Sequence, residues 1–306
     1  MDMQDTLFDD KIIEKYGIGA GIIPITIDPN NNIRILLAKE RFVPNWKGSF
    51  RWSGFEGAKK DNETMVETAI RELKEESLGI VKFDYSIEDT IHNKSYVARV
   101  VINIHQDNPS RRYHSTFLLN CEWNPQWISE FDVCKSKLNA LKTMGEELQT
   151  LDSKKNIPHQ LSNVGTLKHV TDVVFEKQQY EITFETTEDE SHTLKVSACV
   201  QNDVFYNWFC KRKQLTTYME DFEHDAVSVT RDANGLILQL TVDDDHLEKE
   251  RIHWWAIDDL ANVLKCKGTY YSEQFRACFM PVLQTIVERF NTGNDTNYCI
   301  ECRDDK

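Results

Sequence analysis

The chain has 306 residues, 40% of them hydrophobic and 28% charged, which is typical of a folded protein with one large or two medium domains. Its net charge of -14 argues against an extended nucleic-acid groove, because phosphates are contacted by clustered Lys and Arg. No apolar run reaches the roughly 18 to 20 residues of a membrane span, and the N-terminus is acidic, unlike a signal peptide. We therefore expect a cytoplasmic protein without a membrane partner, and no protein partner is indicated.

Hydrophobic periodicity predicts a mixture of strands and helices along the whole chain. The first two strands flank a DPNNN turn, which favours a hairpin. The expected strands cover residues 17–27, 33–39, 81–87, 96–104, 113–121, 173–184, 193–200, 226–230 and 236–242, with a last strand that ends at 257. The expected helices cover residues 61–78, 127–151 and 202–222, a segment from 258, and residues 272–290.

The most informative stretch runs from Gly57 to Ile80, GAKKDNETMVETAIRELKEESLGI. Its helical spacing places the apolar residues on one face that we expect to be buried, namely Val66, Ala69, Ile70 and Leu73.

Carboxylates gather elsewhere on the same predicted helix. Glu72, Glu75 and Glu76 stand at i, i+3 and i+4, the spacing that brings side chains together, and Glu63 lies at the N-terminal end. Crowded carboxylates raise one another's pKa, a cost that a bound divalent cation removes. Hard cations such as Mg²⁺ take oxygen ligands and share them with phosphates. The six residues RELKEE alone also fit a solvated helix face with Glu and Lys or Arg pairs.

The complete spacing decides between these two interpretations. Gly57, five residues, Glu63, seven residues and then Arg71-Glu72-Leu73-Lys74-Glu75-Glu76 resembles the signature of the Nudix hydrolases. There is one departure, because Leu78 stands where the family has Gly.

A strand that ends in WWAI, followed by Asp-Asp-Leu, is similar to the last strand and helix of many Nudix domains. The resemblance implies the α+β class, as a Nudix α/β/α sandwich with a mixed sheet interrupted by a large mixed α/β insertion. It assigns residues 10–121, with the box at 57–80, and 246–292 to the Nudix domain and 122–245 to the insertion. Residues 293–306, at the end of the chain, are expected to form a loose tail.

The same resemblance implies the site residues. A further Glu upstream of the Trp reaches the metal in many family members; Glu248 matches the commonest placing and Glu250 is the second candidate. The implied cofactor is Mg²⁺ or Mn²⁺, with the ligands Glu72, Glu75, Glu76 and Glu248 or Glu250. One of Glu75, Glu76 and Glu248 is expected to take a proton from water, and Arg71 to hold Glu75 by an ion pair.

The run RELKEES resembles the mRNA-decapping Nudix enzymes of large DNA viruses, of the poxvirus and giant-virus type. Phe42 and Tyr113 are similar to the aromatics that stack on methylated guanine in such enzymes, and Asp107 is the nearest acid for the N–H edge of the base. Trp46 and Phe50 are further candidates for the first plane. In the alternative interpretation, Phe42 belongs to the core and Tyr113 is a structural aromatic of its strand.

The leading hypothesis is a metal-dependent hydrolase that removes the 5′ cap of mRNA and releases 7-methylguanosine diphosphate and 5′-monophosphate RNA. Capped mRNA is then the partner, and a viral protein would act in the host cytoplasm. The alternatives are a pyrophosphatase for a free nucleotide diphosphate derivative or a diphosphoinositol polyphosphate, and a non-catalytic Nudix binding module. The only dense basic clusters are Arg111-Arg112 and Lys211-Arg212-Lys213.

Other constellations carry little chemistry. The cysteines include one CxxC pair, Cys299 and Cys302, and we expect free thiols in a reducing compartment. His105 and His114 have no ligand partners at metal spacing, so we expect solvated histidines.

Overall fold

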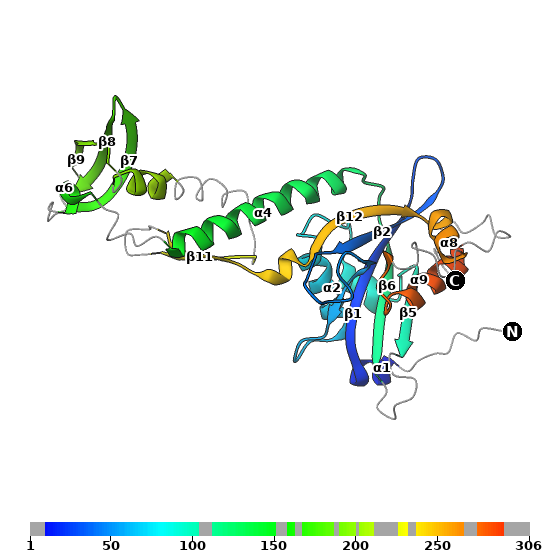
Figure 1. Cartoon of the computed structure of the whole chain (residues 1–306). Coiled ribbons are helices and arrows are strands. Elements are labelled where there is room, and N and C mark those ends of the chain that lie inside the picture. The colour runs from blue at the N-terminus through cyan, green and yellow to red at the C-terminus, as the bar shows by residue number, and fades with distance from the viewer. Residues whose placement is uncertain are drawn as a thin grey trace. The chain divides into compact units, whose positions relative to one another are not determined.

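The chain divides into two compact units, Met1–Lys135 with Asp244–Lys306, and Ser136–Asp243 (Figure 1). The first unit is therefore assembled from two segments that are far apart in the sequence. The computed structural model describes residues 10–103, 112–150, 158–162, 167–186, 190–199, 202–210, 226–231, 237–265 and 274–290.

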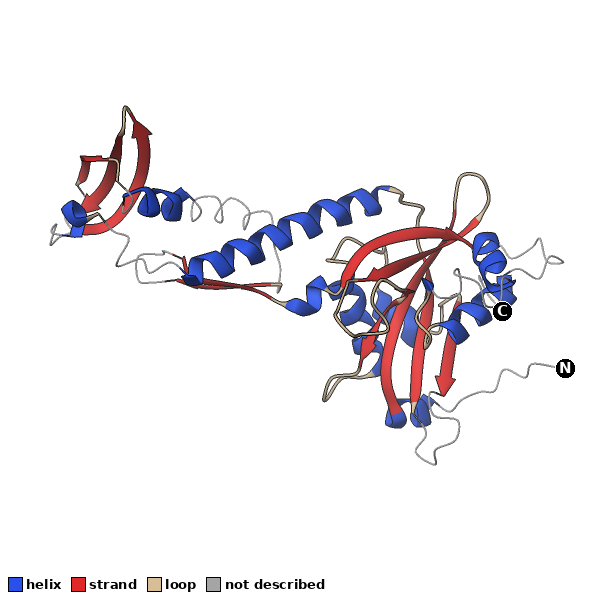
Figure 2. Cartoon of the chain, viewed as in Figure 1, coloured by secondary structure: helices blue, strands red, loops and turns tan. Residues whose placement is uncertain are grey.

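The first unit is built on a mixed seven-stranded sheet (Figure 2). The strands follow the order β12-β2-β1-β6-β5, while β3 pairs with β2 and β4 pairs with β1. The pair of β1 and β6 is parallel, and the other pairs are antiparallel. The strands are β1 (Gly17–Ile27), β2 (Ile33–Glu40), β3 (Trp52–Ser53), β4 (Phe55–Ala58), β5 (Ala98–Asn103), β6 (Tyr113–Asn120) and β12 (Lys249–Ala256).

The helices of this unit pack against the sheet or against one another. They are α1 (Asp10–Tyr16), α2 (Met65–Glu76), α3 (Ile87–His92), the 3₁₀ helix η1 (Asp244–Leu247), α8 (Ile257–Lys265) and α9 (Met280–Phe290).

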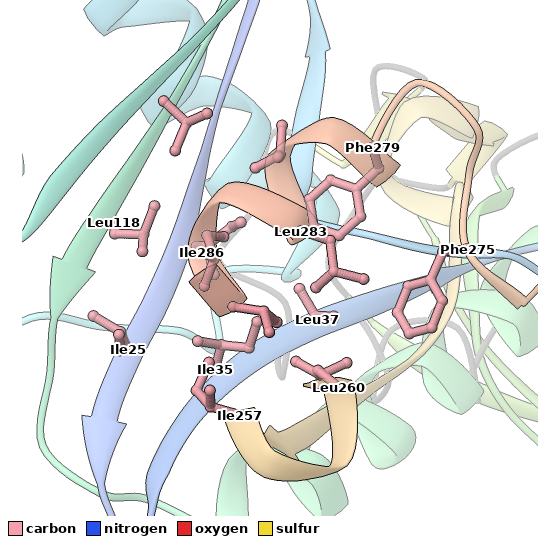
Figure 3. Packing of buried hydrophobic residues seen from close by; sticks show 14 of the residues in the cluster. Ile25, Ile35, Leu37, Leu118, Ile257, Leu260, Phe275, Phe279, Leu283 and Ile286 are labelled. Atoms are coloured by element: carbon pink, nitrogen blue, oxygen red, sulfur yellow. The ribbon is translucent and has the colours of Figure 1, made fainter. Parts of the chain in front are cut away.

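The main hydrophobic core lies between one face of the sheet and the two last helices. Figure 3 shows Leu283 and Ile286 of α9 and Leu260 of α8 packed over side chains of β1, β2 and β6, among them Ile25 and Leu118. Neighbouring strand residues point to the opposite face, where α2 packs against β1, β4 and β6. The sheet therefore lies between helices on both faces, and the predicted α/β/α arrangement with a mixed sheet is confirmed.

Asp28 fixes the hairpin between β1 and β2. Its carboxylate accepts hydrogen bonds from the backbone N–H groups of Asn30 and Asn32, both at 2.9 Å, and from Arg34 Nε at 2.8 Å. Asn31 takes a positive φ of 62°, a conformation that Asn tolerates well. The hairpin expected around DPNNN is confirmed by the antiparallel pairing of the two strands.

The second unit contains two antiparallel sheets, β7-β8-β9 and β10-β11. Gly145 of α4 has no room for a side chain, because a Cβ atom there would lie 2.5 Å from the carbonyl oxygen of Leu240. The elements are the greater part of α4 (Gln126–Thr150), α6 (His159–Ser162), β7 (Leu167–Glu176), β8 (Gln179–Thr186), β9 (Ser191–Ser197), a helix over residues 202–210, β10 (Val227–Arg231) and β11 (Ile237–Val242).

Two predicted strands are wrong. The chain forms no strand over residues 81–87; Ser86 instead caps α3, its Oγ accepting from Asp89 N at 3.2 Å, with acidic residues in the first turn of the helix. Residues 173–184 belong to two strands, since Lys177 and Gln178 form a turn with φ of 48° and 63°. Lys and Gln are not typical turn residues, so the pattern gave no signal.

The remaining expectations differ mainly at element ends. The last helix begins at Met280 and not at residue 272, with Pro281 in its first turn. The pairing of β10 with β11 confirms the second predicted hairpin, whose Asn-Gly turn lies outside the described residues, as do the predicted tail and residues 211–222 of the third predicted helix. Of the described cysteines, Cys121, Cys199, Cys210 and Cys278 have free thiols. Within the described part of the chain, no helix is long and apolar enough to cross a bilayer.

The packing of α9 predicts a specific loss of stability. Leu283 is fully buried in the core, so Leu283→Ala should lower the free energy of unfolding by about 2–5 kcal/mol. Thr285→Ala, on the exposed side of the same helix, should change it by less than about 0.5 kcal/mol. Urea denaturation of both variants measures the difference, and equal costs would contradict the assignment of α9 to the core.

Candidate active site

The buried face of α2 differs from the predicted one and includes two of its glutamates. The sequence predicts Val66 and Ile70 as buried, but both are only half-buried. The buried residues of this helix are Met65, Thr68, Ala69, Glu72, Leu73 and Glu76. Two acidic residues of the motif therefore lie on the face that packs on the sheet, which contradicts an interpretation of this run as a solvated surface.

Arg71 is the centre of the exposed half of the site. Its Nε donates to Glu63 Oε1 at 2.6 Å, and its Nη1 donates to Glu72 Oε1 at 2.7 Å and Glu75 Oε2 at 2.8 Å. Its Nη2 donates to the carbonyl oxygen of Ala58 at 2.9 Å. The ion pair expected between Arg71 and Glu75 is thus present, and the same guanidinium also fixes the loop before the helix.

The charges around Arg71 shift the pKa values of its partners in opposite directions. Hydrogen bonds from Arg71 lower the pKa of Glu63 to about 2. Burial raises the pKa of Glu72, and the negative charges of Glu75 and Glu248 add to this effect, although Arg71 opposes it. Glu248 therefore interacts electrostatically with the carboxylates of α2 from the other end of the chain, and a cation placed between these groups would be attracted by all of them.

Gly57 is required by the position of the Glu72 carboxylate. A Cβ atom at Gly57 would lie 2.3 Å from Glu72 Oε1. The backbone of the loop can therefore approach the carboxylate only without a side chain, which gives the glycine of the motif a steric reason.

The C-terminal end of α2 accommodates the departure from the motif. Leu78 takes a φ of 56°, the left-handed conformation, and is followed by Gly79 with a φ of 66°. The backbone N–H of Gly79 donates to the carbonyl oxygen of Lys74 at 2.9 Å. A non-glycine residue in this conformation costs about 1–3 kcal/mol, and Leu78 compensates for part of this cost by being buried. The turn is formed without the family's glycine.

Lys249 is the centre of the buried half of the site. This side chain is 1% exposed, and its Nζ lies 2.6 Å from Glu40 Oε1, 2.9 Å from Glu76 Oε1 and 3.1 Å from Ser53 Oγ. Burial acts to lower the pKa of Lys249, but Glu76 and Glu40 outweigh it and raise the pKa, so the ammonium stays charged. Arg276 Nη1 also donates to Glu40 Oε1, at 3.1 Å.

Glu76 is held from both sides. Its Oε1 contacts Lys249, and its Oε2 accepts a hydrogen bond of 2.8 Å from the backbone N–H of Glu56. Burial raises the pKa of Glu76 well above its usual value, while Lys249 acts in the opposite direction. The backbone of β4 and the start of β12 therefore fix the last carboxylate of the motif.

The two candidates for a further acid, Glu248 and Glu250, have different environments. Glu248 follows η1 and precedes β12, and its carbonyl oxygen accepts from the backbone N–H of Arg41 at 2.8 Å. Burial of its carboxyl and the charges of Glu40 and Asp245 raise the pKa of Glu248, although Lys249 opposes this. Glu250 is exposed at an irregularity in the pairing of β12 with β2. No hydrogen bond or ion pair in the described part of the chain links Glu250 to α2.

The donor set suits a hard divalent cation. Glu72, Glu75, Glu76 and Glu248 offer only carboxylate oxygens, which Mg²⁺ and Mn²⁺ prefer. Within the described residues, no three ligand side chains converge on one point, because the carboxylates are turned toward Arg71 and Lys249. The residues fit the cation by the chemistry of their oxygen atoms.

The residues proposed for cap recognition are not arranged as an open sandwich. Phe42 is 60% exposed and stacks on Phe50, with ring centroids 5.4 Å apart. Tyr113 is only 3% exposed at the start of β6, so its ring offers no open face to a base. Asp107 lies outside the described residues. The expectation of two open planes at Phe42 and Tyr113 is therefore not met in this conformation.

Sequence reasoning missed the basic partner of the buried site and misplaced a histidine. Lys249 follows Glu248 in the run LEKER, where acidic and basic residues alternate. Nothing in this alternation distinguishes a buried lysine from an exposed one. His114 is not solvated: its side chain is 17% exposed, and its Nε2 lies 3.9 Å from Glu56 Oε2. Glu56 lies directly before Gly57 in β4 and pairs with Gly21 of β1.

The buried charge network predicts a large cost for removing its cation. Lys249→Met leaves Glu40 and Glu76 buried without their partner and should lower the free energy of unfolding by about 3–5 kcal/mol. Adding Glu40→Gln should restore part of the loss, since one buried charge is then removed. Lys265→Met, an exposed lysine of α8, is the control. Urea denaturation tests this, and a cost no larger than that of the control would contradict the network.

No protein-family model and no curated protein matches this chain. Among solved structures, it is similar to a bifunctional NMN adenylyltransferase/ADP ribose pyrophosphatase complexed with AMP and Mn ion from Francisella tularensis, with 19% identity and a TM-score of 0.25 over 36% of this chain and 28% of that chain. It is similar to the Nudix hydrolase RenU of M. smegmatis, with 14% identity and a TM-score of 0.26 over 36% of this chain and 61% of that chain.

A third similar structure is a MutT/nudix family protein from Enterococcus faecalis, with 9% identity and a TM-score of 0.23 over 74% of this chain and 85% of that chain. The match spans less than two thirds of the length of each of the first two proteins, at 28% and 61%. Because the identities and TM-scores are this low, the function is inferred from the chain's own residues.

Proposed function

We propose that this protein is a Nudix pyrophosphohydrolase, which uses a divalent cation and water to cleave a phosphoanhydride bond. One observation carries the proposal: the acidic residues of a Nudix-like motif are gathered by Arg71 and Lys249 at one end of a mixed sheet. Glu248, from the far end of the chain, adds its charge to the same group. Such a concentration of carboxylates has little structural benefit but suits a cation shared with phosphates.

Glu72, Glu75, Glu76 and Glu248 would hold the cation. When bound, Mg²⁺ or Mn²⁺ neutralises phosphate charge and lowers the pKa of a water molecule. The role of Arg71 is to position the acids, because it contacts Glu63, Glu72 and Glu75 together. Lys249 has the same role for Glu76.

Of the three candidates for the general base, we favour Glu248. Both oxygens of Glu76 already accept hydrogen bonds or ion pairs, and Glu75 is held by Arg71 and Lys60. The Glu248 carboxylate has no hydrogen bond or ion pair to another described side chain, and its pKa is raised. A carboxylate whose oxygens are not already bonded is better suited to accept a proton than one held by cations.

As the substrate, we propose the 5′ cap of mRNA, cleaved to 7-methylguanosine diphosphate and 5′-monophosphate RNA. The loop between β2 and β3 supports this, because it exposes Phe42, Trp46 and Phe50 by 60%, 39% and 47%. Lys39 Nζ lies 5.3 Å from the Phe50 ring, and Arg276 lies 5.4 Å from the Trp46 ring. Aromatic and basic side chains side by side suit stacked bases and phosphates. A viral origin and a host cytoplasmic location belong to the same proposal.

A second candidate substrate is a free nucleotide diphosphate derivative. The burial of Tyr113 favours it, since only one of the two planes expected for a methylated guanine is open.

The position of Gly57 generates a test of the metal site. Gly57→Ala places a methyl group against the Glu72 carboxylate, so the carboxylate must move while the fold is retained. We expect Mn²⁺ affinity, measured by isothermal titration calorimetry, to fall by about 10–100-fold with little change in the urea midpoint. Ala58→Ser, at the next and exposed position, should leave both unchanged. Unaltered Mn²⁺ affinity in Gly57→Ala would argue against Glu72 as a ligand.

The activity itself is tested with RNA carrying a labelled cap, incubated with the protein and Mg²⁺ or Mn²⁺. We expect labelled 7-methylguanosine diphosphate, a rate at least about 100-fold lower for Glu75→Gln, and inhibition by salt, because phosphate contacts release counterions. Turnover of free nucleotide diphosphates but not of capped RNA would support the second candidate. No metal-dependent cleavage of any phosphoanhydride would overturn the proposed function.

A further inference from the structure

A small cavity of about 200 Å³ lies on the face of the sheet covered by α9, next to the carboxylate site. Pockets for complete ligands measure about 300–1,000 Å³, so this one has room for part of a nucleotide. Its walls combine aliphatic and ionisable side chains, among them Ile18, Ile102 and Val282 with Glu56, His114 and Arg276.

Glu56 lines this cavity and has an unsatisfied acceptor. Its side chain is 6% exposed, and its Oε2 has no hydrogen-bond partner within the described part of the chain. His114 Nε2 lies 3.9 Å away, which is beyond hydrogen-bond distance. A buried carboxylate oxygen without a donor is costly. A ligand that brings N–H groups would remove this cost.

Arg276 supplies the complementary donor. Its Nη1 donates to Glu40, its guanidinium lies over the Trp46 ring, and its side chain is 26% exposed. The cavity thus offers an acceptor and a donor between aliphatic walls. A flat heterocycle with N–H donors and a carbonyl oxygen on one edge fits this combination. Guanine has both, because its N1–H and N2–H₂ donate while O6 accepts, and O6 is a common partner of arginine in proteins.

The cavity adjoins the proposed metal site through two consecutive residues. Glu56 lines the cavity with its side chain and binds Glu76 with its backbone N–H. Gly57 also lines the cavity and lies against Glu72. β4 thus contributes to both places, with the cavity on one side of this strand and the α2 carboxylates on the other. A nucleotide whose base enters the cavity reaches these carboxylates if its phosphates pass around β4.

We propose that this cavity binds the guanine base of the substrate, with Glu56 accepting from its N–H edge and Arg276 donating to O6. This inference rests on the proposed function for the meaning of the adjacent carboxylates. The recognised edge is shared by a free guanine nucleotide and by the methylated guanine of a cap.

The test uses nucleoside monophosphates, which contain no phosphoanhydride bond and are therefore not substrates. In calorimetry with the full chain, GMP should bind at least about tenfold more tightly than AMP, and IMP, which lacks the N2 amino group, should bind more weakly than GMP. 7-Methyl-GMP distinguishes the two possible ligands. Binding equal to or tighter than that of GMP indicates the methylated guanine of a cap, and weaker binding indicates free guanine nucleotides. Either result supports the site.

Glu56→Gln keeps the shape of the side chain and the backbone bond to Glu76. It should reduce GMP affinity about tenfold and remove the preference over IMP. Glu130→Gln, an exposed residue of α4, is the matched control and should change neither. A crystal structure with GMP gives a second measurement in case Glu56→Gln does not fold.

Equal binding of GMP and AMP, unchanged GMP affinity in Glu56→Gln, or a cavity that holds only water beside bound GMP would each overturn the inference. Because these ligands are not hydrolysed, the result is separable from the proposed activity. Guanine binding without hydrolysis would leave the inference standing and contradict the enzyme, and hydrolysis without guanine preference would do the reverse.

Discussion

The candidate active site depends on two cations that hold carboxylates together. Arg71 contacts Glu63, Glu72 and Glu75, and the buried Lys249 joins Glu76 to Glu40. Without these cations, a protein with a net charge of -14 would have to keep like charges close together, which is unfavourable at low dielectric. The two interactions differ in origin, since Arg71 belongs to the helix itself and Lys249 comes from a strand more than half the chain away. The pairing of β12 with β2 at the edge of the sheet therefore also completes the site.

The carboxylates and their helix were predictable because their spacing is local. Gly57, Arg71 and the glutamates lie within 24 residues, and helical geometry alone places them near one another. Lys249 was not predictable, because only the antiparallel register of β12 with β2 brings it opposite Glu40. The same distinction applies to the fold. The hairpin at Asp28 follows from local turn chemistry, whereas the strand expected over residues 81–87 was a short apolar pattern that the cap at Ser86 ends. The turn at Lys177 and Gln178, which contains no typical turn residue, divides another expected strand into two.

Substrate recognition was the least predictable part of the site. Phe42 and Tyr113 were proposed from resemblance, but their exposures differ: the Phe42 side chain is on the surface and the Tyr113 side chain is buried. The acceptor that the structure offers instead is Glu56, whose side chain lies in a cavity that forms only when β4, β6 and the segment before α9 come together. The alternation of polar and apolar residues in a four-residue strand does not indicate that these segments form a cavity. The position of Arg276 in the sequence does not indicate it either.

The central claim is that the acids of α2 and Glu248 form one cation site. The most direct measurement is a crystal structure with Mn²⁺ and a non-hydrolysable diphosphate analogue, using the anomalous scattering of manganese to locate the ion. We expect an anomalous peak coordinated by oxygens of Glu72, Glu75, Glu76 and Glu248 and by the analogue's phosphates, with Arg71 still in contact with Glu63. A fully ordered site with the analogue bound and no manganese beside α2 would contradict it.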